Sequence, residues 1–343
     1  MSATPVQPPP LAWSWSSVGR GVVLAVPASV AAVDDVRTAA ALAIGLMPVA
    51  PLPLAPARKS RLRAGLFGVL AAVSIVVGGL LAVWPPLAVA GILAIAVVAG
   101  RAVAQRPSAM LVLTLCLPLV GIGLSYPGLS TVGPVAALIV LGSAYAVAVS
   151  LCWPAGSSRQ PAPAASALPP GDLVRYGWLA GLAGAVCAAV GFALDLEHVG
   201  WATAASLLVM RPAPLQQRQR SLDRLGDVVL GAIVAATLVL VDPPGGGYAL
   251  AIGLAVVVAT ATGGSRRYVL PFFTTFFVFL LLLGDDPSDA RSRFWERVGE
   301  TALGVGVAAL FGFVVPAVLD RRTASRVGSA PGGTEGRASG GSG

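Results

Sequence analysis

The fold class is decided by the stretch from Trp201 to Gly231, WATAASLLVMRPAPLQQRQRSLDRLGDVVLG. It begins as an apolar run, becomes strongly basic, and turns apolar again near residue 225. In membrane proteins, basic residues gather in the loops that face the cytoplasm. The stretch therefore predicts two membrane-embedded segments joined by a basic cytoplasmic loop.

The composition of the whole chain agrees with this reading. Of the 343 residues, 56% are hydrophobic and only 11% are charged, whereas a soluble domain carries about 25% charged residues. Apolar runs long enough for membrane helices recur along the chain, and short alternating strands are absent, so we expect an all-α polytopic membrane protein. The net charge of +8 comes from arginine clusters between these runs, which favours membrane topology over nucleic-acid binding.

The chain divides into two blocks of similar length. We expect a disordered N-terminus (1–19), a first six-helix repeat (20–153), a Pro/Ala-rich cytoplasmic linker (154–173), a second six-helix repeat (174–319) and a disordered cytoplasmic tail (320–343). Landmarks recur in the same order about 160 residues apart: LMP at 46–48 and VMRP at 209–212, RKSRLR at 58–63 and RQRSLDR at 218–224, WPP at 84–86 and VDPP at 241–244. This order predicts an internal duplication.

Six helices per copy is an even number, so the copies would face the same way as parallel repeats, with about twelve transmembrane helices in all. Segments 20–33 and 198–210 are short for a spanning helix, which needs about 20 residues. Ten spans therefore remain an alternative, and 198–210 could be a broken or re-entrant helix.

The distribution of charge predicts the orientation. Basic residues concentrate in loops 57–63, 101–106, 211–224 and 265–267, while loops 34–37 and 195–198 are acidic. The positive-inside rule then places both termini in the cytoplasm of a multi-pass protein of the plasma (inner) membrane.

Three charged residues of the basic stretch are candidates for a substrate-binding or gating site. Arg211 ends the short run and precedes Pro212, where it either snorkels to the interface or meets an anion. Asp227 follows Arg224 inside the apolar boundary. The pair either belongs to a capped helix start, or Asp227 faces a cavity and there holds the arginine or relays protons.

A second carboxylate, Glu300, precedes the last long apolar run. It either forms an interfacial pair with Arg297 or acts as a coupling or gating group. Its helix contains four glycines, which predict close helix packing: Gly299, Gly304, Gly306 and Gly312.

Aromatic residues supply the remaining candidates. Four phenylalanines between 272 and 277, among them Phe273 and Phe276, form one broad helical face. That face either meets lipid and neighbouring helices or lines a cavity for an aromatic solute. Trp201 is a further candidate for lining the route.

Signatures of enzymes and cofactor sites are missing from the sequence. The GGG at 245–247 is not followed by Lys-Ser or Lys-Thr, and neither G-x-S-x-G nor H-E-x-x-H occurs. The three cysteines show no metal spacing, and the single histidine, His198, argues against a histidine-based metal site. We read His198 as a solvated loop residue and expect no enzymatic activity, no cofactor and no metal.

The two halves of the opening stretch, WATAASLLVMRP and QRQRSLDRLGDVVLG, resemble the signature of the fusaric-acid-resistance-like (FUSC) membrane family. The resemblance is clear over about 176–315 and faint over the first block. Asp227 stands where the family usually has Thr, and Arg224 lies only two residues before the first glycine. The matching residues are Trp201, Ala202, Arg211, Pro212, Arg224, Gly226 and Gly231.

The resemblance implies an inner-membrane transporter for a small organic anion, because some members look like exporters of aromatic carboxylic acids. We therefore expect ion-gradient-driven export of a small organic carboxylate, with aromatic acids among the candidates, lipid as the surroundings and no nucleic-acid partner. A passive anion channel and a non-transporting scaffold of an envelope complex remain alternatives. Homodimerisation and a partner protein in the cell envelope also stay open.

Overall fold

The computed structural model describes residues 11–52, 54–106, 110, 112–154, 169–196, 198–210, 226, 230–231, 233–241, 243–265, 269–283, 290–319 and 321. These residues form helices and connecting turns, and no strand occurs among them. The all-helical class expected from the sequence is confirmed.

The first block contains six helical segments. They are α1 (Trp15–Ala31), α2 (Val36–Leu46), α3 (Arg58–Ala82), α4 (Pro85–Gln105), α5 (Leu117–Gly123) and α6 (Leu129–Cys152). A π-helical turn, Val112–Cys116, leads into α5. Local sequence explains several of the starts: Asp35 caps α2 by accepting hydrogen bonds from the amides of Arg37 and Thr38, and α4 begins on a proline, which suits the first turn of a helix.

The second block contains α7 (Pro170–Ala193), α8 (Val199–Val209), α10 (Gly245–Ala261), α11 (Val269–Leu283) and α12 (Ala290–Ala309). Residues 230–231 and 233–241 are also helical. A π-helical turn, Leu310–Val314, continues α12.

Five helices among the described residues are long and apolar enough to cross a membrane: Arg58–Ala82, Pro85–Gln105, Leu129–Cys152, Pro170–Ala193 and Val298–Leu319. The shorter apolar segments are Val36–Leu46, Val112–Gly123, Val199–Val209, Gly245–Ala261 and Phe272–Leu281. A multi-pass membrane protein is therefore supported, whereas a count of twelve spanning helices is not reached. The segment expected to be short, 198–210, forms an 11-residue helix, which covers only about half of the hydrocarbon thickness.

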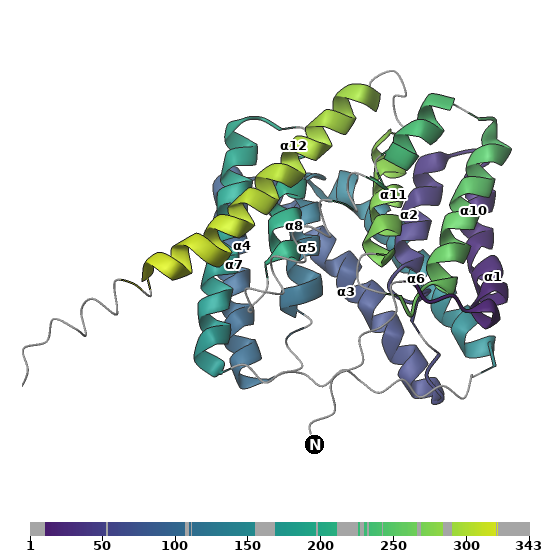
Figure 1. Cartoon of the computed structure of the whole chain (residues 1–343), viewed down its shortest axis with the longest axis horizontal. Helices are drawn as coiled ribbons and strands as arrows, with labels where there is room; N and C mark the ends of the chain where they lie inside the picture. Colours follow the sequence, from purple (N-terminus) through teal and green to yellow (C-terminus); the bar gives the residue numbers. More distant parts are fainter. Residues whose placement is uncertain are drawn as a thin grey trace, which may run out of the picture.

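Helices from the two blocks pack against each other in pairs. Helix α4 packs along α7, and α1 packs along α10. Figure 1 shows the first pair on the left of the bundle and the second on the right, with α3 between them. On the left, α8 contacts α5, α7 and α12, and on the right, α2 contacts α6 and α11. Neither block forms a separate domain, because the strongest helix pairs join one block to the other.

Several predicted boundaries are wrong, and each error has a local cause. The basic run 58–63 is the start of α3 rather than a loop, because Arg and Lys favour helix and no proline interrupts the turn. Helix α1 begins at Trp15, so residues 15–19 are helical. Helix α7 begins at Pro170, inside the predicted linker. Helix α2 ends at Leu46, just before Pro48, although the apolar run of the sequence that begins at residue 38 continues to residue 56.

The predicted disorder of the termini and the linker falls mostly on residues 1–10, 155–168 and 322–343, which lie outside the described residues. The division into two six-helix repeats likewise stays a prediction.

Candidate functional site

Helix α8 is buried along almost its whole length, with Leu208 as the one partly exposed residue between Val199 and Val209. Most of its side chains are small, so α5, α7 and α12 approach it closely. Trp201 is the large exception and is only 2% exposed. The Gly200 amide donates to the Ser125 hydroxyl at 3.1 Å, which ties the start of α8 to the turn before α6.

Glu300 lies on α12, the helix that packs along α8, and is only 4% exposed. Two further ionisable side chains lie beside it: Glu296, one helical turn earlier, and His198, the residue that directly precedes α8. One ligand atom from each of the three side chains lies within 4.8 Å of the others. The predicted interfacial partner, the Arg297 side chain, lies outside the described residues.

His198 and Glu296 are half-buried rather than solvated. The prediction that His198 is a solvated loop residue is therefore wrong. Its cause is tertiary: α12 crosses α8 and covers the end of α8 where His198 lies. Figure 1 shows α12 running obliquely over this side of the bundle.

The glycines of α12 differ in their surroundings. A Cβ atom added at Gly304 would lie 2.5 Å from the carbonyl oxygen of Ala202 on α8, so only glycine permits this approach. A Cβ atom added at Gly299 or Gly306 would meet nothing within 4 Å. Close packing is therefore confirmed for Gly304, whereas Gly299 and Gly306 approach none of the described residues, and for Gly312 it stays a prediction.

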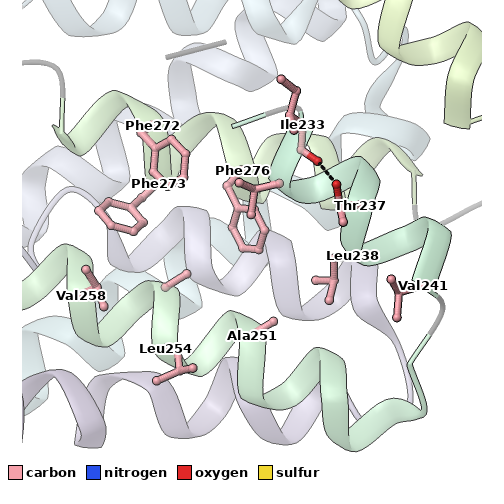
Figure 2. Close-up of a pocket in the computed structure, with 12 residues that line it drawn as sticks. Ile233, Thr237, Leu238, Val241, Ala251, Leu254, Val258, Phe272, Phe273 and Phe276 are labelled. Atoms are coloured by element: carbon pink, nitrogen blue, oxygen red, sulfur yellow. Dashed lines mark hydrogen bonds between the residues drawn. The ribbon is translucent and has the colours of Figure 1, made fainter. Parts of the chain in front are cut away.

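The phenylalanine face of α11 borders a cavity of about 630 Å³. Figure 2 shows Phe272, Phe273 and Phe276 on one side and residues of α10 on the opposite side. The other lining residues are Ile233, Val234, Thr237, Leu238, Val241, Ala251, Leu254, Ala255 and Val258. Among these described residues, only Thr237 has a polar side-chain group, and its hydroxyl donates to the carbonyl oxygen of Ile233 at 2.7 Å.

This cavity suits an aromatic ring or a lipid chain better than an ionised carboxylate. Its lining contains no cation among the described residues, and burying a charge without a partner is costly. Leu254 and Val241 are more than half exposed, so the cavity opens on the outer surface of the bundle. A carboxylate would have to be met by charged residues elsewhere.

The structure places two of the predicted site residues on neighbouring helices and two others in a different part of the bundle. Trp201 and Glu300 lie on the contacting helices α8 and α12. Phe273 and Phe276 belong instead to the apolar core shared by α1, α2, α10 and α11. The remaining three predicted residues, Arg211, Arg224 and Asp227, lie outside the described residues.

Two buried arginines were not singled out by the sequence. The Arg61 guanidinium donates to the carbonyl oxygens of Ala55 at 2.7 Å, Trp153 at 2.7 Å and Ser150. Arg20 donates to the carbonyl oxygen of Ala50 at 2.9 Å. Both look in the sequence like ordinary interfacial arginines, and their burial depends on backbone turns that hydropathy does not reveal.

Arg61 also lines a second cavity, of about 270 Å³, together with the exposed residues Ser60 and Arg63. Because backbone carbonyls already accept hydrogen bonds from its Nε and Nη1 atoms, Arg61 links α3 to the end of α6. That use makes it a structural link rather than the first choice for a substrate anion.

The second half of the chain also matches a known family. The model of the family described as fusaric acid resistance protein-like matches residues 185–311. This region is similar to the fusaric acid resistance protein-like family. No match was found among curated proteins or among solved structures.

The matched region runs from the second half of α7 to the π-helical turn after α12. It therefore includes all of α8 and the α8–α12 crossing, as well as the aromatic face of α11. The fusaric acid resistance protein-like match supports a general role in membrane transport and confirms the resemblance read from the Trp201–Gly231 stretch.

Proposed function

We propose that this protein exports a small organic carboxylate, with an aromatic ring, across the plasma membrane by using an ion gradient. The observation that carries the proposal is the fusaric acid resistance protein-like match over 185–311, on a chain with five membrane-spanning candidates. Transport rather than catalysis also agrees with the absence of enzyme signatures from the sequence.

In this proposal, one part of the matched region binds the ring of the substrate and another part binds its carboxylate. The cavity beside Phe273 and Phe276 offers an apolar surface for a ring. The carboxylate needs a cation, and Arg211 and Arg224 in the basic stretch after α8 are its proposed partners. Asp227 would hold Arg224 in place or relay protons, and Trp201 would shape the route from within α8.

The proposed architecture is two parallel repeats related by a pseudo-twofold axis along the membrane normal. Equivalent helix pairs support this arrangement: α1 packs on α10 as α7 packs on α4, and α2 packs on α6 as α8 packs on α12. The contact between α5 and α8 likewise has a counterpart between α11 and α2. Gly142 on α6 approaches the carbonyl oxygen of Leu42 on α2, as Gly304 on α12 approaches that of Ala202 on α8.

The proposed orientation places the arginine-rich segments around residues 58–63 and 211–224, and both termini, in the cytoplasm. An anionic substrate would then meet Arg211 and Arg224 on the side from which it is exported. The acidic segments 34–37 and 195–198 would face outward.

The test is flux through the purified protein in proteoliposomes, with benzoate as the aromatic probe and butanoate as the aliphatic one. Replacement Arg211→Ala should lower benzoate flux by about tenfold or more, because one charge-assisted hydrogen bond is lost. The matched control is Arg106→Ala, which removes an exposed arginine outside the matched region. It should leave the flux unchanged.

The outcomes separate the rival functions. Benzoate accumulation against its gradient, driven by an imposed proton or sodium gradient, supports the exporter. Steady downhill currents that need no ion gradient would show a passive anion channel instead. If neither probe crosses the membrane although the protein is monodisperse, the transport proposal fails and a scaffold role takes its place.

A further inference from the structure

Two carboxylates and the only histidine of the chain converge where α12 crosses the start of α8. Glu296 and Glu300 are four residues apart on α12 and therefore share one face of that helix. His198 comes from the N-cap of α8. Their ligand atoms lie within 4.8 Å of one another, so three side chains from two helices point into one small volume.

The charge of this cluster favours a cation. Glu300 is 4% exposed and Glu296 is half-buried. Two carboxylates this close destabilise each other's ionised form, most of all away from water, unless a proton or a positive charge joins them. A divalent cation bound by both carboxylates and by the imidazole nitrogen would offset this repulsion.

We infer that His198, Glu296 and Glu300 bind a divalent transition-metal ion, with Zn²⁺ as the best match. Metal bonds of about 2.1 Å in a tetrahedral site place neighbouring ligand atoms about 3.4 Å apart, so small side-chain rotations suffice to close the site. Imidazole nitrogen selects Zn²⁺ and its transition-metal neighbours over Ca²⁺ and Mg²⁺, which prefer oxygen ligands alone. Three protein ligands leave one position for water or another ligand.

The helices that carry the ligands are held firmly in relation to each other. Gly304 brings α12 against the backbone of α8 two turns beyond Glu296. The Gly200 amide ties the start of α8 to Ser125. A metal ion at the cluster would fasten the beginning of α8 to α12, and so would stabilise the crossing. This inference does not depend on the transport proposal.

The sequence argued against such a site because it contains one histidine. A set of one histidine and two carboxylates needs no second histidine, and residues 198 and 296 are far apart in the chain. The helix spacing of Glu296 and Glu300 was visible in the sequence, but their meeting with His198 depends on the tertiary contact between α8 and α12.

The experiment measures metal binding to the full chain, purified in detergent with an affinity tag that contains no histidine. After removal of metal with a chelator, Zn²⁺ is titrated in competition with a chromophoric chelator. We expect one Zn²⁺ ion per chain and a thermal unfolding temperature that rises with Zn²⁺ concentration. Co²⁺ should bind at the same site and show the visible absorption of a low-coordinate nitrogen and oxygen environment.

The variants His198→Ala and Glu296→Gln should each weaken Zn²⁺ binding by about tenfold or more and abolish the Co²⁺ bands. Glu300→Gln should do the same, and the other two variants keep the test decisive if burial makes that protein unstable. The matched control is Asp195→Asn, because Asn tolerates the left-handed φ of 51° found at Asp195. This variant should bind Zn²⁺ like the wild type.

Two results would overturn the inference. One is Zn²⁺ binding that is unaffected by His198→Ala and Glu296→Gln. The other is a wild-type protein whose unfolding temperature changes with pH but does not change when Zn²⁺ or Co²⁺ is added. That second result would show that the carboxylates share a proton instead of a metal.

Discussion

Buried arginines in this protein are held by backbone carbonyl oxygens at the ends of helices. Arg61 joins the segment before α3 to the end of α6, and Arg20 joins α1 to the turn after α2. A guanidinium satisfies several carbonyls at once through its fork of donors. The guanidinium groups of Arg20 and Arg61 therefore bind backbone carbonyl oxygens near helix ends. The substrate anion is instead proposed to bind Arg211 and Arg224.

Replacing Arg61 tests this distinction. Arg61→Ala leaves the carbonyl oxygens of Ser150 and Trp153 without this donor, and we expect a stability loss of about 2 kcal/mol or more. Thermal unfolding in detergent measures the loss, and Arg63→Ala, at an exposed position in the same helix, serves as the control. Benzoate flux per folded molecule should be unchanged. Full stability with lost flux would instead place Arg61 in the substrate route.

Glu300 was selected from the sequence because a carboxylate beside a long apolar run is unusual. The structure shows that its side chain is buried, whereas its role in transport stays a prediction. His198 was misjudged because its neighbours lie far along the chain. A charged residue beside an apolar run is visible in the local sequence. The residue that pairs with it depends on how the helices cross.

Helix positions followed from hydropathy, whereas helix contacts did not. The apolar runs of the sequence at 87–104, 132–153 and 176–194 correspond to α4, α6 and α7. Each run ends within one residue of its helix, and the helices begin two to six residues before the runs. The four glycines between residues 299 and 312 suggested close packing, but periodicity alone does not tell which glycine faces α8. Only Gly304 is shown to meet a neighbouring backbone there.

Substitution of these glycines tests the α8–α12 crossing. Gly304→Ala places a Cβ atom 2.5 Å from the Ala202 carbonyl oxygen, so the helices must separate, at a cost of about 1–3 kcal/mol. The unfolding temperature in detergent should fall. In Gly306→Ala, the new methyl group meets nothing within 4 Å, and the same measurement should show no loss. Equal effects of the two substitutions would mean that α12 does not pack on α8 through Gly304.

At the scale of the whole molecule, the proposal of a doubled bundle rests on the recurring landmarks in the sequence and on the similar helix contacts of the two blocks. The landmarks lie about 160 residues apart, and α1–α10 and α4–α7 are the corresponding pairs between blocks. The sequence suggests a duplication because the recurring proline and arginine positions can be read from the order of residues alone. It could not give the interleaving of the blocks, which depends on small residues such as Gly100 and Gly177 meeting across α4 and α7.

The proposed transport mechanism depends on this doubled arrangement being parallel in the membrane. Parallel repeats put equivalent loops on the same side, whereas inverted repeats put them on opposite sides. Single cysteines introduced into equivalent loops distinguish the two cases. The background for them is a chain in which Cys116, Cys152 and Cys187 are replaced by alanine.

The most direct test labels four such variants with a membrane-impermeant maleimide, in intact spheroplasts and after permeabilisation. Ser130→Cys, at the start of α6, and Ser288→Cys, in the segment before α12, represent the two predicted outer ends, and Ser60→Cys and Gln217→Cys represent the two basic segments. We predict that the first two are labelled in intact spheroplasts and the last two only after permeabilisation. Labelling of Gln217→Cys from outside, or opposite sidedness within either pair, would contradict a parallel pair of repeats with cytoplasmic basic loops.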